Sequence, residues 1–210
     1  AGGLPVVGAT VAVVGVGGGP PQHNGLLGAA GGCPRPWPVA QRHADGIVWP
    51  DSLAELALKQ AQLAHWRGEP DKVREHLASV QELLGRTEMV SSVRAKIMDL
   101  YGYLTDDVEQ ARAYRRQAFE AAMENMYPPT IAESLVGIAD VALREGRYEQ
   151  AARLIAASDA VRGTPDRSLP DAARIAEETR EHLGETAFAE ETLDGRRRDL
   201  RELAEITLTR

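Results

Sequence analysis

The segment at residues 130–162, TIAESLVGIADVALREGRYEQAARLIAASDAVR, constrains the fold of this chain more than any other. Apolar residues recur in it at steps of three and four, first over residues 131–143 and again over residues 148–156. That period is typical of amphipathic α-helices, and Gly146 between the two runs ends the first one. A connection this short makes consecutive helices pack antiparallel. The segment therefore predicts a helical hairpin.

Two local patterns predict where the first helix of this hairpin begins. Thr130, followed three residues later by Glu133, has the spacing of a capping box, in which the two side chains bond the free N–H groups of a helix start. Pro128 and Pro129 lie just before it, and proline is excluded from a helix interior. We therefore expect the helix to begin at about Ile131.

The same two-helix pattern occurs twice more, upstream of this segment. Ser52 and Glu55 have capping-box spacing and mark the start of the first hairpin. After the last hairpin the spacing breaks, and Pro170 fits the first position of a further helix. The sequence thus predicts hairpins at about residues 52–85, 88–127 and 130–162, followed by capping helices within residues 168–208.

Alignment of the three predicted turns shows how regular the repeat is. Gly68, Asp106 and Gly146 fall in one column, at steps of 38 and 40 residues. A tetratricopeptide (TPR) unit has about 34 residues, so these hairpins are longer. Asp99 and Arg115 occupy columns that are small or apolar in the other two hairpins. The second hairpin is therefore expected to be out of register by one residue or to pack irregularly.

Composition supports an all-α chain and narrows the classes of function. Aromatic residues make up only 5% of the sequence, while Ala, Leu, Glu and Arg are abundant. The net charge of −7 argues against direct nucleic-acid binding, which requires an excess of Lys and Arg. The single cysteine, Cys33, excludes an internal disulfide and suits the cytoplasm. We expect TPR-like antiparallel hairpins that form a right-handed α-solenoid with a C-terminal capping segment.

The first 50 residues form a Gly- and Pro-rich leader and connector that differs from the helical domain at residues 51–210. Residues 1–34 contain no Lys, Arg, Asp or Glu and hold 11 of the 20 glycines. Gly15 and Gly17 begin a pattern like that of a dinucleotide-binding loop, but Pro20 stands where the third glycine belongs. The apolar run within this leader is too short to span a bilayer. We predict neither a cofactor site nor a membrane span here.

Motifs for catalysis and metal binding do not occur in the sequence. There is no HExxH, CxxC or GxSxG, and the five histidines are scattered. Carboxylates lie at helical offsets from basic residues, as expected for solvated faces. The interpretation is a noncatalytic protein without a metal or other cofactor.

A concave groove is the predicted place of function. In a TPR array the first helix of each hairpin lines the groove, and an aromatic and charged lining suits a bound protein or peptide segment. The alignment places ten residues on this lining. Eight of them are the predicted partner-binding residues, Lys59, Gln62, Trp66, Lys96, Leu100, Tyr103, Asp140 and Arg144, and the other two are Glu55 and Glu133.

Three stretches of the C-terminal half carry a resemblance to a known family. They are REGRYEQAARLIAASDAVRG at residues 144–163, PDRSLPDAARIAEETREHLGETAFAEE at residues 165–191 and GRRRDL at residues 195–200. The residues in these stretches, and the order of the stretches, resemble the C-terminal TPR region of the large actinobacterial antibiotic-regulatory transcriptional activators. Those proteins also carry DNA-binding and ATPase domains. The resemblance implies a regulatory module that binds a protein partner or the other domains of its own polypeptide.

Two other interpretations stay open. The chain could be a free-standing TPR adaptor or scaffold, and a small-molecule sensor would fit the same architecture. An uncapped first hairpin would expose apolar surface that a second copy could cover, so a homodimer belongs among the expected states.

Overall fold

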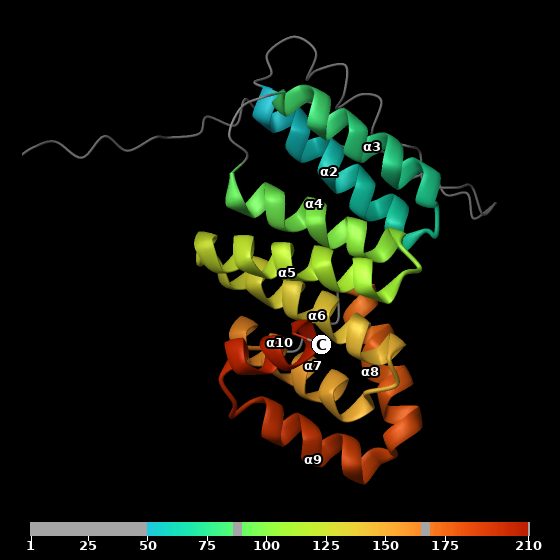
Figure 1. The fold of residues 1–210 in the computed structure, drawn as a ribbon, viewed down its shortest axis with the longest axis vertical. Helices are drawn as coiled ribbons and strands as arrows, with labels where there is room; N and C mark the ends of the chain where they lie inside the picture. Colours follow the sequence, from blue (N-terminus) through green and yellow to red (C-terminus); the bar gives the residue numbers. More distant parts are fainter. Residues whose placement is uncertain (1–49, 86–89, 165–168, 210) are drawn as a thin grey trace, which may run out of the picture.

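The structure is a computed structural model that describes residues 50–85, 90–164 and 169–209, and every regular element in these ranges is an α-helix (Figure 1). This confirms the all-α prediction. The leader, the predicted start of the second hairpin at residue 88 and Ser168 lie outside the described residues. The helices are α2 (Pro50–Trp66), α3 (Pro70–Leu84), α4 (Ser91–Leu104), α5 (Val108–Asn125), α6 (Pro128–Arg144), α7 (Tyr148–Arg162), α8 (Pro170–Leu183), α9 (Glu185–Gly195) and α10 (Leu200–Leu208).

Consecutive helices pack in pairs, and the pairs are layered along the long axis of the molecule (Figure 1). α2 packs on α3, α4 on α5 and α6 on α7, and the short connections make each pair antiparallel. α8 lies against α6 and α7, while α9 lies alongside α7 at the lower end of the stack. α10 then turns back and packs against α5, α6 and α7, so the C-terminal helix lies beside the middle of the stack rather than at its end.

The turns of the first and third pairs are built in the same way. Gly68 and Gly146 have φ values of +69° and +70°, a conformation that glycine adopts without steric cost. Each glycine donates its N–H to the carbonyl three residues earlier, at 2.9 Å in both turns. The α4–α5 turn differs, because there the Asp107 carboxylate accepts the N–H groups of the first turn of α5. Asp106 therefore shares an alignment column with the two glycines but not their conformation.

Two predicted helix starts are wrong. α6 begins at Pro128, and Thr130 lies buried in its first turn, with Tyr127 at the cap position. α2 begins at Pro50, so Ser52 is already inside the helix. The reason is the same in both helices: N–H groups in the first turn have no acceptor within the helix, so proline is tolerated there. Proline thus begins these helices instead of preceding them.

The apolar core of the described residues consists of two clusters. The first is formed by α2, α3 and part of α4, with Leu77 and Ile97 among its buried side chains. The second joins α5, α6, α7, α8 and α10. The spacing of Leu200, Leu203, Ala204 and Ile206 in the sequence predicts the apolar face of α10, and this is partly wrong, because Ile206 is 40% exposed while Thr207 is fully buried. No helix in the described ranges is long and apolar enough to cross a membrane.

Candidate functional site

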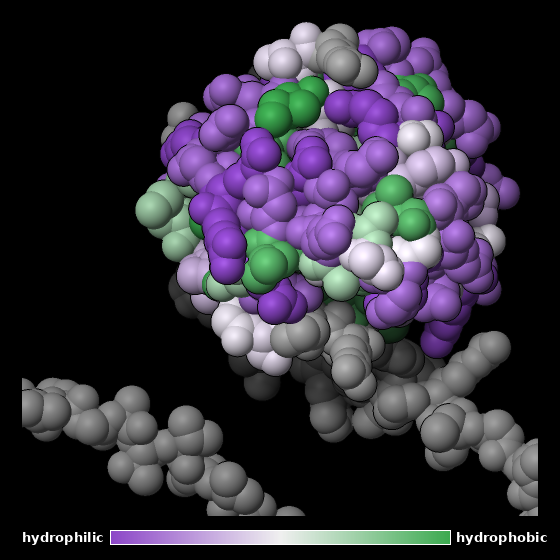
Figure 2. Space-filling view, turned by 90° about the horizontal axis from the view of Figure 1, so that it is seen from below, coloured by the Kyte–Doolittle hydropathy of each residue, from purple (hydrophilic) through white to green (hydrophobic). Residues whose placement is uncertain are grey.

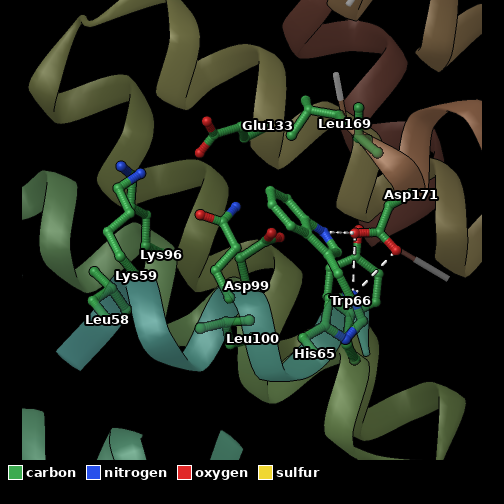
Figure 3. A pocket seen from close by; sticks show the side chains of 13 residues that line it. Leu58, Lys59, His65, Trp66, Lys96, Asp99, Leu100, Glu133, Leu169 and Asp171 are labelled. Atoms are coloured by element: carbon green, nitrogen blue, oxygen red, sulfur yellow. Dashed lines mark hydrogen bonds and ion pairs between the residues drawn. The ribbon is translucent and has the colours of Figure 1, made fainter. Parts of the chain in front are cut away.

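A pocket opens between α2, α4, α6 and the start of α8 (Figure 3). The space in it that can hold a water-sized molecule is about 30 Å³, and the empty space of about 510 Å³ in and around it includes open solvent. The structure brings six of the eight predicted groove residues onto its walls, namely Lys59, Gln62, Trp66, Lys96, Leu100 and Tyr103. The other walls come from Leu58, His65, Asp99, Glu133, Val136, Leu169 and Asp171.

The two ends of the pocket differ in chemistry. Lys59 of α2 and Lys96 of α4 lie side by side at one end, and Trp66 points toward Asp171 of α8 at the other (Figure 3). Partial burial lowers the pKa of Lys59, and the neighbouring positive charge of Lys96 lowers it further. Asp99 and Leu100 of α4 lie between the two ends (Figure 3), and further aliphatic side chains line the walls. The pocket thus combines a positive end with an apolar body.

The carboxylates on the walls all have partners. Asp171 accepts the indole N–H of Trp66 at 3.0 Å and lies 3.1 Å from His65 Nε2. Burial alone would raise the pKa of Asp171, but the hydrogen bonds from His65 and Trp66 outweigh it and lower the pKa. Glu133 lies 3.9 Å from an Arg162 guanidinium nitrogen.

Asp99, the third wall carboxylate, is ion-paired with the fully buried Arg115. The same Arg115 nitrogen, Nη1, also donates to the Asp99 carbonyl at 2.6 Å. Burial raises the pKa of Asp99 to about 6, against the opposing attraction of the guanidinium. Asp99 and Arg115 are the two residues that departed from the repeat columns. Each departure compensates the other, so the second hairpin carries a buried ion pair where the other hairpins carry apolar contacts.

A stack of three side chains joins this ion pair to the pocket. The Arg115 guanidinium carbon lies 3.8 Å from the centre of the Tyr103 ring, a cation–π contact. His65 stacks on Tyr103 with ring centres 4.2 Å apart and an angle of 23° between the planes. Both groups approach the ring face closely, so they lie on opposite faces. Tyr103 therefore links α5 to α2 through the wall of the pocket.

Asp140 and Arg144, the remaining predicted groove residues, line an adjoining pocket that shares His65, Tyr103 and Asp171 with the first. Asp140 is 2% exposed and holds Arg144 Nε at 2.8 Å and Arg174 Nη2 at 2.6 Å. The side chains of Asp140 and Arg144 are therefore engaged with each other and with α8.

Sequence reasoning missed the part of the site that α8 supplies. Asp171 follows Pro170 at a helix start, a pattern that located the helix but did not indicate which hairpin it would meet. Its partners His65 and Trp66 lie more than 100 residues away in sequence. The buried ion pair could have been predicted, because Asp99 and Arg115 have opposite charges and both replace small or apolar residues in the same hairpin.

The arrangement is chemically suited to recognition. The charged end, the aliphatic wall and the indole can contact an amphipathic group through ion pairing and apolar packing. Among the described residues there is no group of three or more His, Cys, Asp or Glu side chains that could hold a metal ion. The residues that line the two pockets include no Ser, Thr or Cys.

Comparisons with protein-family models, with curated proteins and with solved structures gave no match for this chain.

Proposed function

We propose that this chain is the noncatalytic TPR-like module of a bacterial transcriptional regulator, and that it binds a protein segment in the pocket between α2, α4 and α6. The observation that carries the proposal is the origin of the pocket walls: the first helix of each of three successive pairs contributes to one pocket. A groove that is lined by the first helix of each pair, with aromatic and charged side chains, suits an extended peptide or a helix. The occupant is either a separate protein or another domain of the same regulator.

Two features support a TPR-like right-handed α-solenoid. The first and third pairs share one turn conformation at Gly68 and Gly146, as repeated units would. The end of the stack beyond α9 is covered largely by polar side chains (Figure 2). A repeat array needs such a polar face at its terminus, because the last apolar layer would otherwise meet water.

A photo-crosslinking experiment in the source organism tests this proposal. The photoreactive residue p-benzoylphenylalanine replaces Gln62, which lines the pocket, or, as a matched control, the exposed Glu190 of α9. Illumination is expected to join position 62, but not position 190, to a protein segment that mass spectrometry then identifies. The absence of a specific adduct at position 62 would contradict segment binding.

An immunoblot of extract taken before illumination, probed with an antibody to the chain, gives the intact mass of the natural protein. A product several times the 22.7 kDa of this chain supports a module within a larger regulator. A product near 22.7 kDa would overturn that part of the proposal and favour the free-standing adaptor.

A small-molecule sensor is the second candidate, and the form of the pocket favours it. The pocket is narrow, and Leu169 and Asp171 close it on the side of α8 (Figure 3). A small ligand is compatible with such a confined space, whereas a folded domain is not. For this candidate, illumination at position 62 would produce no protein adduct.

A further inference from the structure

The two lysines of the pocket are unusual in this chain. The sequence contains 21 arginines and only three lysines, Lys59, Lys72 and Lys96. Two of the three lie side by side in one pocket, although they belong to different helix pairs (Figure 3). An ammonium group is a compact donor that rotates freely, whereas a guanidinium imposes a planar fork. Two converging lysines therefore suit a single small anionic group.

No carboxylate of the described residues lies within ion-pair distance of these lysines, although Glu133 and Glu55 attract Lys59 from further away. Within the described ranges, neither Lys59 nor Lys96 forms an ion pair, while Asp99, Glu133 and Asp171 on the same walls are each engaged elsewhere. Two like charges held close together repel each other, and an anion placed between them removes that repulsion. This end of the pocket thus holds two ammonium groups without a direct counter-ion among the described residues.

Apolar surface lies next to this positive end. Leu58 and Leu100 lie near the lysines, and Leu169 and the Trp66 indole lie further toward α8 (Figure 3). Val136 also lines the pocket. An anionic group bound at the lysines would therefore bring an adjacent apolar group onto this wall. The rest of the molecule is acidic, with a net charge of −7, which disfavours a ligand with many negative charges. A single carboxylate beside an apolar side chain fits both conditions.

We infer that Lys59 and Lys96 form a carboxylate-binding subsite, and that the segment held in the pocket presents an acidic residue next to a large apolar residue. The acidic side chain lies between the two ammonium groups, and the apolar side chain packs against Leu100 and Trp66. This inference rests on the proposed function, because it names the chemistry of the segment that the pocket holds.

Selection from a random dodecapeptide phage library tests the inference and does not require the natural partner to be identified first. The baits are the full chain, the double variant Lys59→Gln/Lys96→Gln, and Lys72→Gln as a matched control on exposed α3 surface. Glutamine is one atom shorter than lysine, but it keeps a polar end and the helix propensity while it removes the charge. The expected result is a set of peptides with Asp or Glu beside a large apolar residue, recovered on the full chain and on Lys72→Gln but lost on the double variant.

The affinity of the chain for a synthetic peptide from that set then measures how much the lysines contribute to binding. Replacement of its acidic residue by the matching amide, or of either lysine by glutamine, is expected to weaken binding at least about tenfold, as loss of a charged hydrogen bond does. The two changes combined should cost little more than one alone, because they remove the same contact.

The possible failures separate the inference from the proposed function. Enrichment of neutral or basic peptides that bind the double variant equally well would overturn the carboxylate subsite and leave segment binding in place. Failure to enrich any peptide on the folded full chain would count against segment binding itself and therefore against both. Circular dichroism of each bait confirms that it is folded.

Discussion

Arg115 has no exposed surface, and its environment accounts for how a charged side chain is held in the core. Removal of a guanidinium from water is costly unless its charge and donors are matched. Here Asp99 supplies the ion pair, Tyr103 covers the planar face, and Asp140 lies 3.9 Å from the second terminal nitrogen. Among the described residues, Nε and Nη2 find no hydrogen-bond acceptor, so the match is incomplete. Space for the group comes from Gly137, where an added β-carbon would lie 2.6 Å from Arg115 Nη1. The position therefore depends on glycine for volume.

Substitution of Gly137 by alanine tests this dependence. We expect the free energy of unfolding to fall by about 1–3 kcal/mol, because the new methyl group would overlap the guanidinium and the Asp99 carboxylate. The same substitution in an Asp99→Ala/Arg115→Leu background, which restores the apolar columns of the other pairs, should cost almost nothing. Urea unfolding of the four proteins gives the comparison, and an equal cost in both backgrounds would refute the explanation.

α8 connects the start of the stack to its end. Its first turn places Asp171 against Trp66 and His65 of α2, and one turn later Arg174 reaches Asp140 of α6. α8 thus closes one side of the pocket and fixes the first helix pair relative to the third. Few apolar contacts are involved in the link to α2, so polar contacts at Asp171 determine it.

The matched substitutions Asp171→Ala and Asp71→Ala test that link. Both aspartates follow a proline at a helix start, but the Asp171 side chain is only 15% exposed, against α2, while the Asp71 side chain is 97% exposed. Loss of Asp171 leaves the Trp66 N–H without its acceptor and should lower the free energy of unfolding by about 1–3 kcal/mol. Asp71→Ala should change it by less than about 0.5 kcal/mol. Similar effects from the two variants in urea unfolding would show that α8 is not tied to α2 in this way.

The sequence predicted single helices better than the contacts between distant helices. Periodicity and Gly146 were sufficient for the hairpin of α6 and α7, because those are local properties of the chain. Six predicted groove residues lie in one pocket because residues in the same column of the turn alignment take equivalent places in successive helix pairs. The contact of Asp171 with α2 has no local pattern, since it depends on how all intervening pairs stack. Ile206 failed as a core residue for the same reason: the direction in which α10 returns determines which of its faces is buried.

At the scale of the whole molecule, α10 acts as a brace across three helices. Leu203 and Leu208 enter the second core cluster, and Gln150 of α7 donates to the Leu203 carbonyl at 2.8 Å. Arg116 of α5 donates to the carbonyl of Leu208, which belongs to the last turn of α10. A helix of nine residues has little stability alone, so these contacts maintain it.

Leu203→Ala and Ile206→Ala measure the contribution of this brace on its two faces. Leu203 is fully buried, and its truncation should lower the free energy of unfolding by about 2–5 kcal/mol through loss of packing and creation of a cavity. Ile206 is 40% exposed, and its truncation should cost less than about 1 kcal/mol. The reverse order in thermal or urea unfolding would mean that α10 packs with its other face inward.

The division of the core into two clusters has a consequence for cooperativity. Lys59 and Leu58 belong to α2, in the first cluster, whereas Glu133 and Val136 belong to α6, in the second. Where units of a layered protein open separately, the opening of the α2–α3 pair removes one wall of the pocket without unfolding the rest. An occupant that contacts both walls would then hold the α2–α3 pair against α6. Its binding would raise the free energy of that partial opening more than it raises the free energy of unfolding of α6, α7 and α10. Affinity for the occupant would therefore depend on whether the α2–α3 pair is packed against the rest of the stack.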